Sequence, residues 1–240
     1  MDKTVKNINN AYSDKYKYLI KWNAKCGCTL IRRFFLYLHK DEKDCKENEW
    51  QTGLKTFRYN FEDKPQIINT FIVVRNPFKR VVSMFINKYM GPLNVDNLRH
   101  KFILPENSFL SFVLKLKELK EKNEWLDIHL IPQYYNYNDD DDIIIKLENI
   151  KNRLINLYST IYRLNPLKRK TIEFFSKDIG FINETVKNNT TNFVGLTKYK
   201  DNYNGPWPDY KFFYNEDIKK LVYEIYKEDF IKFKYNYDCI

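Results

Sequence analysis

Two short stretches of this sequence combine cations with small or hydroxyl side chains, a combination suited to binding an anion such as phosphate. The first, "AKCGCTLIRR" at residues 24–33, joins a lysine, a glycine and a threonine and adds two arginines. The second, "VVRNPFKRVVS" at residues 73–83, ends an apolar run on Arg75 and reaches a hydroxyl at Ser83. Guanidinium groups match phosphate oxygens in a bidentate manner. Both stretches therefore predict an anion site.

The residues around the first stretch predict a strand, a tight loop and a helix. "YKYLIKW" at residues 16–22 alternates as a strand does. "LIRRFFLYLHK" at residues 30–40 repeats apolar residues at helical spacing, with Thr29 as the expected N-cap. Such a loop presents backbone N–H groups and the positive end of a helix dipole to an anion. Gly27 would permit close approach of the backbone, and Lys25 would supply a mobile charge.

The second stretch predicts a buried strand followed at once by a helix. "IINTFIVVR" at residues 67–75 is mostly apolar, as in a strand covered on both faces of a parallel sheet. Asn76 and Pro77 then open a helix, because proline is favoured in a first turn. The strand would fix the position of Arg75, and the helix would fix that of Ser83, about two turns later.

The rest of the chain continues the alternation of strands and helices. We expect an amphipathic helix at 106–121, a third core strand at 143–147, helices at 149–158 and 166–178, a loop-rich region at 181–210 and a long amphipathic helix at the end, "NEDIKKLVYEIYKEDFIKFKY". This order predicts the α/β class, as one P-loop-like, three-layer domain with a central, mainly parallel sheet flanked by helices. We place this domain at residues 16–240, after a polar tail at residues 1–15.

Composition restricts the partners and the compartment. The net charge of +10 reflects either a lysine-rich composition or a need for anionic partners. Nucleic acid is not expected, because the sequence lacks a Lys/Arg block, zinc-ligand spacing and RNA-binding aromatics.

Cys26-Gly27-Cys28 is too tight for an ordinary disulfide, which favours a reducing compartment. The N-terminus has no apolar leader and no run reaches the ~18 residues of a membrane helix, so we expect a cytoplasmic protein with no membrane partner.

Together with their flanking elements, the two stretches resemble motifs of the sulfotransferases that use 3′-phosphoadenosine 5′-phosphosulfate (PAPS). "AKCGCTLIRRFF" is similar to the 5′-phosphosulfate loop of the carbohydrate branch, which includes the chondroitin, dermatan and HNK-1 enzymes, although Ala24 replaces a proline. "VVRNPFKRVVSMFINKY" resembles the 3′-phosphate motif of that family at nearly every fixed position. Weaker resemblances extend the similarity over about residues 16–237.

The resemblance implies which residues hold PAPS. The 5′-phosphosulfate would be held by the first motif, through Lys25, Cys26, Gly27, Cys28, Thr29 and Arg32. The 3′-phosphate would be held by Arg75 and Ser83. Lys25 stands where the family has its catalytic lysine, so it would stabilise charge on the leaving oxygen. The expected product is adenosine 3′,5′-bisphosphate, the expected acceptor is a hydroxyl, on a glycan by family analogy, and no metal is expected.

The acceptor hydroxyl usually needs a general base. His129, in "DIHLIPQ", stands where the resembling enzymes often have a histidine, and it is the expected base. The other two histidines, His39 and His100, fall at a helix end and in a polar loop. Related enzymes often carry a further histidine between the two phosphate motifs. This chain has none there, so Glu62 and Asp63 stay open as alternatives.

Two other functions stay open at this point. A P-loop enzyme acting on nucleotides would use a similar loop, but here the lysine precedes Gly27 and no second glycine follows. A non-enzymatic module that binds polyanions would also account for the charge. Arg80 and Lys88 could contact phosphate or pair with carboxylates. The aromatics of "YYNYN" and "NGPWPDY" could form a sugar platform or pack in a core.

Overall fold

The structure is a computed structural model that describes residues 9–13, 17–39, 67, 69–91, 97–139, 142–150, 152–154, 156, 192–201, 203 and 205–238. The chain divides into two compact units. The first comprises residues 1–74 and 136–183, and the second comprises residues 75–135 and 184–240.

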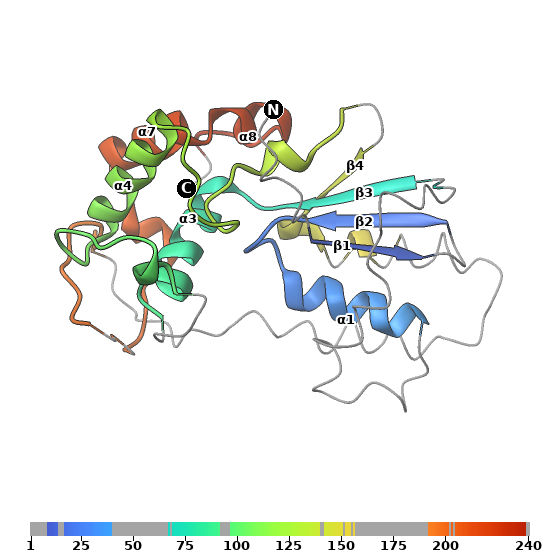
Figure 1. Cartoon of the computed structure of the whole chain (residues 1–240), viewed down its shortest axis with the longest axis horizontal. Coiled ribbons are helices and arrows are strands. Elements are labelled where there is room, and N and C mark those ends of the chain that lie inside the picture. The colour runs from blue at the N-terminus through green and yellow to red at the C-terminus, as the bar shows by residue number, and fades with distance from the viewer. Residues whose placement is uncertain are drawn as a thin grey trace. The chain divides into compact units, whose positions relative to one another are not determined.

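The first unit is built on a sheet with the strand order β1-β2-β3-β4 (Figure 1). The strands are β1 (Asn9–Ser13), β2 (Tyr18–Trp22), β3 (Asn69–Val74) and β4 (Asp142–Lys146). β2, β3 and β4 run parallel, and β1 pairs antiparallel with β2. The predicted α/β class with a mainly parallel sheet is therefore confirmed, as are the three predicted strands.

β1 is not predicted from the sequence, because it lies within the stretch assigned to a polar tail. Its sequence, "NNAYS", shows little strand character. It pairs along its whole length with β2, from Asn9 opposite Trp22 to Ser13 opposite Tyr18. Pairing with a neighbour satisfies the backbone N–H and C=O groups of a polar segment, and hydrophobic periodicity cannot indicate this.

β3 carries a continuous apolar run and is covered on both faces. Thr70 to Val74 are all buried, with β2 paired on one side and β4 on the other. Such burial is typical of an inner parallel strand. β4 differs, since Ile145 is buried but Ile143 is 49% exposed. The predicted third strand therefore exists, but it is less covered than a core strand.

α1 (Cys28–His39) covers one face of this sheet, as Figure 1 shows in blue. Ile31, Phe34 and Phe35 lie at helical spacing, are fully buried and share a core with apolar residues of β2 and β3. The rings of Phe35 and Tyr18 meet edge to face, with their centroids 6.0 Å apart. Burying each such side chain contributes about 1.5–3 kcal/mol. This packing fixes the start of α1 against the sheet.

The start of α1 differs from the prediction. Thr29 is predicted as the N-cap, but the helix already includes Cys28 and Thr29. Its first turn is closed by the Ile31 N–H, which donates to the Gly27 carbonyl at 3.0 Å. The N-cap prediction is therefore wrong, because Gly27, in a left-handed conformation, ends the loop in place of a hydroxyl residue.

Helical structure follows β4, in agreement with the prediction for residues 149–158. η7 (Leu147–Asn149) is a 3-10 turn, and residues 150, 152–154 and 156 are helical. Ile150 and Leu154 are buried in the same core as α1. The predicted helix at 166–178 lies outside the described residues.

The second unit is mainly helical. Its helices are α3 (Pro77–Met84), the π-helical η4 (Phe85–Tyr89) that continues it, α4 (Phe109–Glu121), α7 (Glu216–Ile225) and α8 (Lys227–Lys232). Its short 3-10 turns are η5 (Leu98–His100), η9 (Tyr210–Phe213) and η6 (Gln133–Asn136), whose last residue belongs to the first unit. The predicted helix at 106–121 is confirmed from Phe109 onward. No helix within the described ranges is long and apolar enough to cross a membrane.

Side-chain caps fix where these helices begin. The Asn76 side-chain oxygen accepts hydrogen bonds from the backbone N–H of Phe78 at 2.9 Å and of Lys79 at 3.4 Å. Ser108 caps α4 and Asn215 caps α7 in the same way. Such a cap contributes about 1 kcal/mol. The predicted opening of a helix at Asn76 is therefore confirmed.

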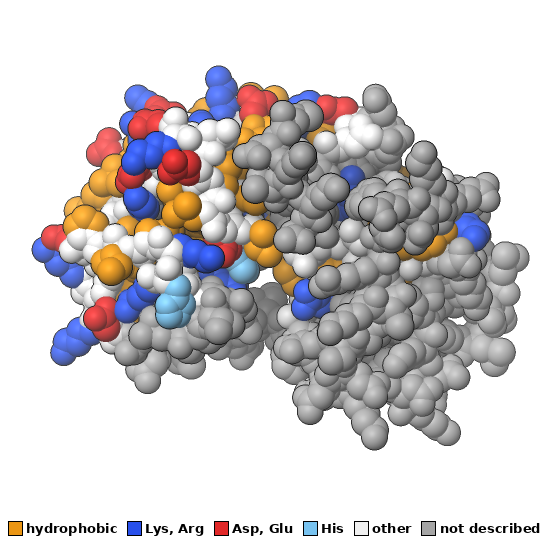
Figure 2. All heavy atoms as spheres, viewed as in Figure 1, with side chains coloured by type: hydrophobic (Ala, Val, Ile, Leu, Met, Phe, Trp, Pro, Cys, Tyr) orange, Lys and Arg blue, Asp and Glu red, His pale blue; other side chains and the backbone are white. Residues whose placement is uncertain are grey.

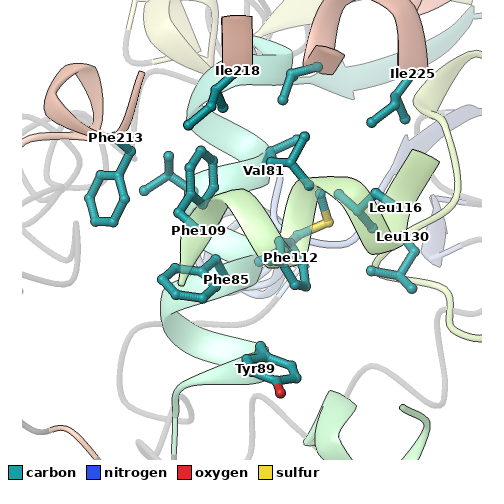
Figure 3. Packing of buried hydrophobic residues seen from close by; sticks show 14 of the residues in the cluster. Val81, Phe85, Tyr89, Phe109, Phe112, Leu116, Leu130, Phe213, Ile218 and Ile225 are labelled. Atoms are coloured by element: carbon teal, nitrogen blue, oxygen red, sulfur yellow. The ribbon is translucent and has the colours of Figure 1, made fainter. Parts of the chain in front are cut away.

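Figure 3 shows the core of the second unit, where aromatic and aliphatic side chains from several helices point toward one another. The labelled residues come from α3, η4, α4, α7 and connecting segments: Val81, Phe85, Tyr89, Phe109, Phe112, Leu116, Leu130, Phe213, Ile218 and Ile225. Nearby, the Tyr214 hydroxyl donates to the Phe78 carbonyl at 2.8 Å, and the two rings meet edge to face. This packing fixes α3, the helix of the second motif.

Trp207, from "NGPWPDY", belongs to this core. It is 6% exposed, and its ring centroid lies 4.7 Å from those of Tyr199 and Tyr203 and 6.1 Å from that of Phe85. Of the two interpretations left open, core packing is therefore confirmed for Trp207. The described part of the region 181–210 has no helix and no strand longer than a single bridge residue before Tyr210, as predicted.

The predicted long C-terminal helix is wrong in one respect, because it is interrupted at Tyr226. This residue has φ −111° and ψ 27° and separates α7 from α8. Its ring is buried, and its hydroxyl donates to the Leu130 carbonyl at 2.9 Å. Apolar periodicity continues through the break, so only the tertiary contacts of Tyr226 reveal it.

Candidate active site

The loop between β2 and α1 makes a sharp turn with two left-handed residues. The Cys26 N–H donates to the Asn23 carbonyl at 3.1 Å, which closes the turn. Lys25 has φ 67° and Gly27 has φ 82°. Residues that alternate in this way orient backbone N–H groups into an anion-binding concavity, and here a helix N-terminus follows. Three other described residues that are not glycine also have positive φ, so this conformation alone does not identify a site.

The two cysteines of the loop are free thiols that take part in its packing. Cys26 is buried and Cys28 is partly buried. Their sulfur atoms lie 3.8 Å from the carbonyl oxygens of Ala24 and Asn23, respectively. The Asn136 side chain donates to the side-chain oxygen of Asn23, where the loop begins. Asn136 thus supports this loop, a role that no local signal in the sequence indicates.

We expect Gly27→Ala to destabilise the loop by about 1–2 kcal/mol, because a residue with a Cβ is strained at a left-handed φ. An added Cβ would also lie 2.6 Å from Leu147 Cδ1, although that flexible side chain can move. Thermal unfolding of Gly27→Ala and of Gly27→Ala/Leu147→Ala separates the two causes. If backbone strain dominates, removing the Leu147 side chain will not restore stability. Full recovery in the double variant would contradict this reason.

Arg75 directly follows β3, and both of its backbone polar groups are held by one side chain. Its N–H donates to Gln133 Oε1 at 2.8 Å, and its carbonyl accepts from Gln133 Nε2 at 2.9 Å. Asn76 then caps α3. The Cα atom from which the Arg75 side chain extends is therefore held in place by the hydrogen bonds of Gln133 and by the capped helix that follows.

Ser83 lies on α3, about two helical turns beyond Arg75, and is partly buried. The Asn87 side-chain amide donates to the Ser83 carbonyl at 3.1 Å and, more weakly, to its hydroxyl at 3.5 Å. A hydroxyl that accepts one hydrogen bond still has its own proton to donate. Ser83 can therefore donate to a phosphate oxygen while Asn87 holds it.

Arg80, whose role the sequence leaves open, is buried and donates hydrogen bonds to backbone carbonyls. It is 1% exposed, and its guanidinium donates to the carbonyls of His129 and Ile131 at 2.9 Å each. It also lies over the ring of Tyr226, 5.9 Å from the centroid. Arg80 thus ties the segment around His129 to α3.

His129 forms a pair with a carboxylate. Asp127 Oδ1 lies 2.5 Å from His129 Nδ1 and 2.9 Å from its backbone nitrogen. A carboxylate only accepts hydrogen bonds, so Nδ1 carries the proton and Nε2 of the neutral ring is the acceptor. Partial burial pushes the pKa of Asp127 upward, but its hydrogen bonds from His129, the charge of His129 when its ring is protonated and the charge of Lys101 outweigh this, and the pKa lies below its ordinary value. Asp127 therefore stays ionised at neutral pH.

The structure brings together the predicted residues of the second unit. Arg80 holds the segment of His129 against the helix of Ser83, and Gln133, four residues after His129, holds Arg75. The residues of the first loop, including Lys25, belong to the first unit. The alternative bases, at positions 62 and 63, lie outside the described residues.

The strands that lead into the two motifs are neighbours in the sheet. β2 and β3 are parallel, and Trp22 at the end of β2 pairs with Val73. Both strands therefore end at the same edge of the sheet, where α/β proteins commonly bind ligands.

Comparison with known proteins identifies a family. The sequence model described as "Sulfotransferase family" matches residues 11–236, which is nearly the whole chain. Neither the curated proteins nor the solved structures gave a match. The matched region begins within β1 and includes the loop before α1, the Arg75–Ser83 motif and the His129 segment. The chain therefore belongs to the sulfotransferase family.

Proposed function

We propose that this sulfotransferase moves the sulfuryl group of PAPS to a hydroxyl acceptor, most naturally on a carbohydrate. The observation that carries the proposal is the strand-to-helix motif at the end of β3. Its arginine is held at both backbone groups, its asparagine caps α3, and its serine keeps a proton to donate. The carbohydrate acceptor rests on the resemblance of both motifs to the chondroitin, dermatan and HNK-1 branch.

In the proposed reaction the acceptor oxygen attacks sulfur in line and adenosine 3′,5′-bisphosphate leaves. Charge increases on the bridging oxygen and spreads over the equatorial oxygens, as in phosphoryl transfer. Lys25 would stabilise the bridging oxygen. The N–H groups of Gly27, Cys28 and Thr29 would hold the 5′-phosphate. Arg32, in the first turns of α1, would add positive charge.

His129 would remove the proton of the acceptor hydroxyl. The neutral ring would accept this proton on Nε2, and Asp127 would stabilise the resulting imidazolium through Nδ1. The proton leaves as the new sulfur–oxygen bond forms and the bond to the bridging oxygen breaks. Asp127 is a positioning residue in this scheme, since it acts through His129.

Arg75→Ala should weaken binding of adenosine 3′,5′-bisphosphate by about 1.5–3 kcal/mol, the usual contribution of a hydrogen bond to a charged group. Ser83→Ala should have a smaller effect, because it removes a neutral donor. Calorimetric titration measures both changes. Arg99→Ala is the matched control, because it removes an arginine of the same unit that pairs with Asp201 at 2.8 Å. Unchanged affinity in a folded Arg75→Ala protein would remove this assignment.

A non-enzymatic polyanion-binding module is less well supported. Figure 2 shows acidic and basic side chains intermixed on the viewed face of the described part of the second unit. Lys115 on α4 and Lys122 at its C-terminal cap pair with Glu118 at 2.7 and 2.8 Å. A surface that attracts polyanions would present one sign of charge. On this face, the intermixing offers a polyanion no surface of one charge sign.

A thermal-shift experiment distinguishes the proposed function from its alternatives. A ligand that binds only the folded state stabilises it by about 2.7 kcal/mol at about 100 times its Kd. For a chain of this size, this raises Tm by several degrees. We expect a clear rise with adenosine 3′,5′-bisphosphate and a smaller one with ATP. A rise with heparin alone would indicate a polyanion-binding module, and a rise with ATP alone would indicate a nucleotide enzyme.

A further inference from the structure

We infer that Gln133 is a positioning residue for donor binding: its side-chain amide fixes the backbone of Arg75, and Asp229 in turn fixes that amide. The inference rests on the proposed role of Arg75 as a ligand of the 3′-phosphate. It concerns two residues outside the two phosphate motifs, and Asp229 lies 96 residues after Gln133.

The side-chain amide of Gln133 forms hydrogen bonds with the backbone of the first residue after the strand pairing ends. The pairing of β3 with β4 reaches Val74 opposite Lys146. At the next residue, Gln133 Oε1 accepts from the Arg75 N–H at 2.8 Å and Gln133 Nε2 donates to its carbonyl at 2.9 Å. Two hydrogen bonds in opposite directions restrain both the position and the rotation of this peptide segment. The arginine side chain therefore starts from a fixed point.

Asp229 determines which way the amide faces. Asp229 Oδ2 accepts from Gln133 Nε2 at 3.3 Å and from the Gln133 backbone N–H at 3.0 Å, and Oδ1 accepts from the Tyr134 N–H at 2.9 Å. Three donors thus converge on one buried carboxyl group, which accepts from all of them. Rotating the amide by half a turn would bring two acceptors together. Asp229 therefore holds Oε1 toward the Arg75 N–H.

Burial makes this arrangement specific for glutamine. Gln133 and Asp229 are both 0% exposed, so water cannot replace a missing hydrogen bond. A glutamate at position 133 could not donate to the Arg75 carbonyl and would place a second carboxyl group beside Asp229. An asparagine would still carry an amide, but it is one methylene shorter and would not reach both Arg75 and Asp229.

The test uses Gln133→Met, which keeps the length of the side chain and removes its amide. We expect affinity for adenosine 3′,5′-bisphosphate to fall by about 10- to 100-fold, because a displaced Arg75 loses its charged hydrogen bond to the 3′-phosphate. Affinity for adenosine 5′-monophosphate, which lacks the 3′-phosphate, should not change. In an Arg75→Ala background, Gln133→Met should cause no further loss, since the two residues act through one contact.

Two further variants separate positioning from stability. Tyr226→Phe removes a buried hydrogen bond to the Leu130 carbonyl, in the same segment, and leaves the Gln133 amide in place. It should lower Tm yet leave bisphosphate affinity unchanged. If Gln133→Met does not fold, Gln133→Asn replaces it, because it retains a buried amide and should show the same selective loss.

The outcomes distinguish this inference from the proposed function. Equal losses for the bisphosphate and the monophosphate, or a further loss in the Arg75→Ala background, would show that Gln133 serves only stability, and would overturn the inference. The inference alone fails if Arg75→Ala weakens bisphosphate binding while both Gln133 variants bind as the wild type does. If Arg75→Ala leaves bisphosphate binding unchanged, the proposed function fails at this residue, and the inference fails with it.

Discussion

His129→Ala should slow sulfuryl transfer by about 10²–10⁴-fold, the usual contribution of a general base, while leaving donor affinity intact. The expectation rests on the pairing of His129 Nδ1 with Asp127 at 2.5 Å, which makes Nε2 the proton acceptor. Turnover is measured with radiolabelled PAPS and a panel of glycan acceptors, and donor affinity by titration with the bisphosphate. His100→Ala is the matched control, because His100 is an exposed histidine of the same unit.

The role of His129 as a base also predicts how the rate of sulfuryl transfer changes with pH. A base must be neutral to accept a proton, so the wild-type rate should rise with pH as the His129 imidazole loses its proton. Asp127 does not contribute to this rise, because its pKa lies below its ordinary value and it is already ionised there. His129→Ala should abolish the rise. Full activity with an unchanged pH profile would place the base elsewhere, with Glu62 and Asp63 next to be tested.

Lys25→Ala should lower kcat by about 10²–10³-fold, comparable to removing one preorganised donor from a developing negative charge. Binding of the bisphosphate product should weaken far less, because charge on the bridging oxygen develops only in the transition state. The measurement compares kcat with product affinity in the same variant.

Lys17→Ala is a matched control for this experiment. Lys17 is also a lysine with positive φ, at 54°, and it lies just before β2. Lys17→Ala removes a lysine with the same backbone conformation from outside the loop between β2 and α1. It should therefore leave kcat unchanged. If Lys25→Ala instead retains kcat while product affinity falls, Lys25 is only an anchor for the phosphate.

Local signals in the sequence were enough to predict the second motif and its elements. This motif consists of an apolar run followed directly by an arginine, an asparagine and a proline. Each of these residues influences only the backbone conformation of the residues next to it. The strand, the Asn76 cap and the start of α3 follow from these residues alone. The same holds for the loop before α1, where only the N-cap was wrong, because Gly27 adopts a conformation that the residue type permits but does not require.

The supports of the candidate site could not be predicted, because they depend on residues far apart in the chain. Gln133 is visible in "DIHLIPQ", but nothing local indicates that its amide reaches Arg75, 58 residues earlier. Asp229 lies within an apparently regular amphipathic helix. Asp127 is the exception, since the spacing Asp-x-His could have indicated a carboxylate partner for His129. β1 was missed for the same reason as Asp229, because only its partner strand makes it a strand.

Calorimetric titration of the full chain with adenosine 3′,5′-bisphosphate, and separately with adenosine 5′-monophosphate, tests the central claim most directly. If the donor is PAPS, the bisphosphate binds at one site and more tightly than the monophosphate, since Arg75 and Ser83 recognise the 3′-phosphate. The preference should disappear in Arg75→Ala and persist in Arg99→Ala. Failure of the wild-type chain to bind the bisphosphate, or equal affinity for both nucleotides, would contradict the proposal that this sulfotransferase uses PAPS.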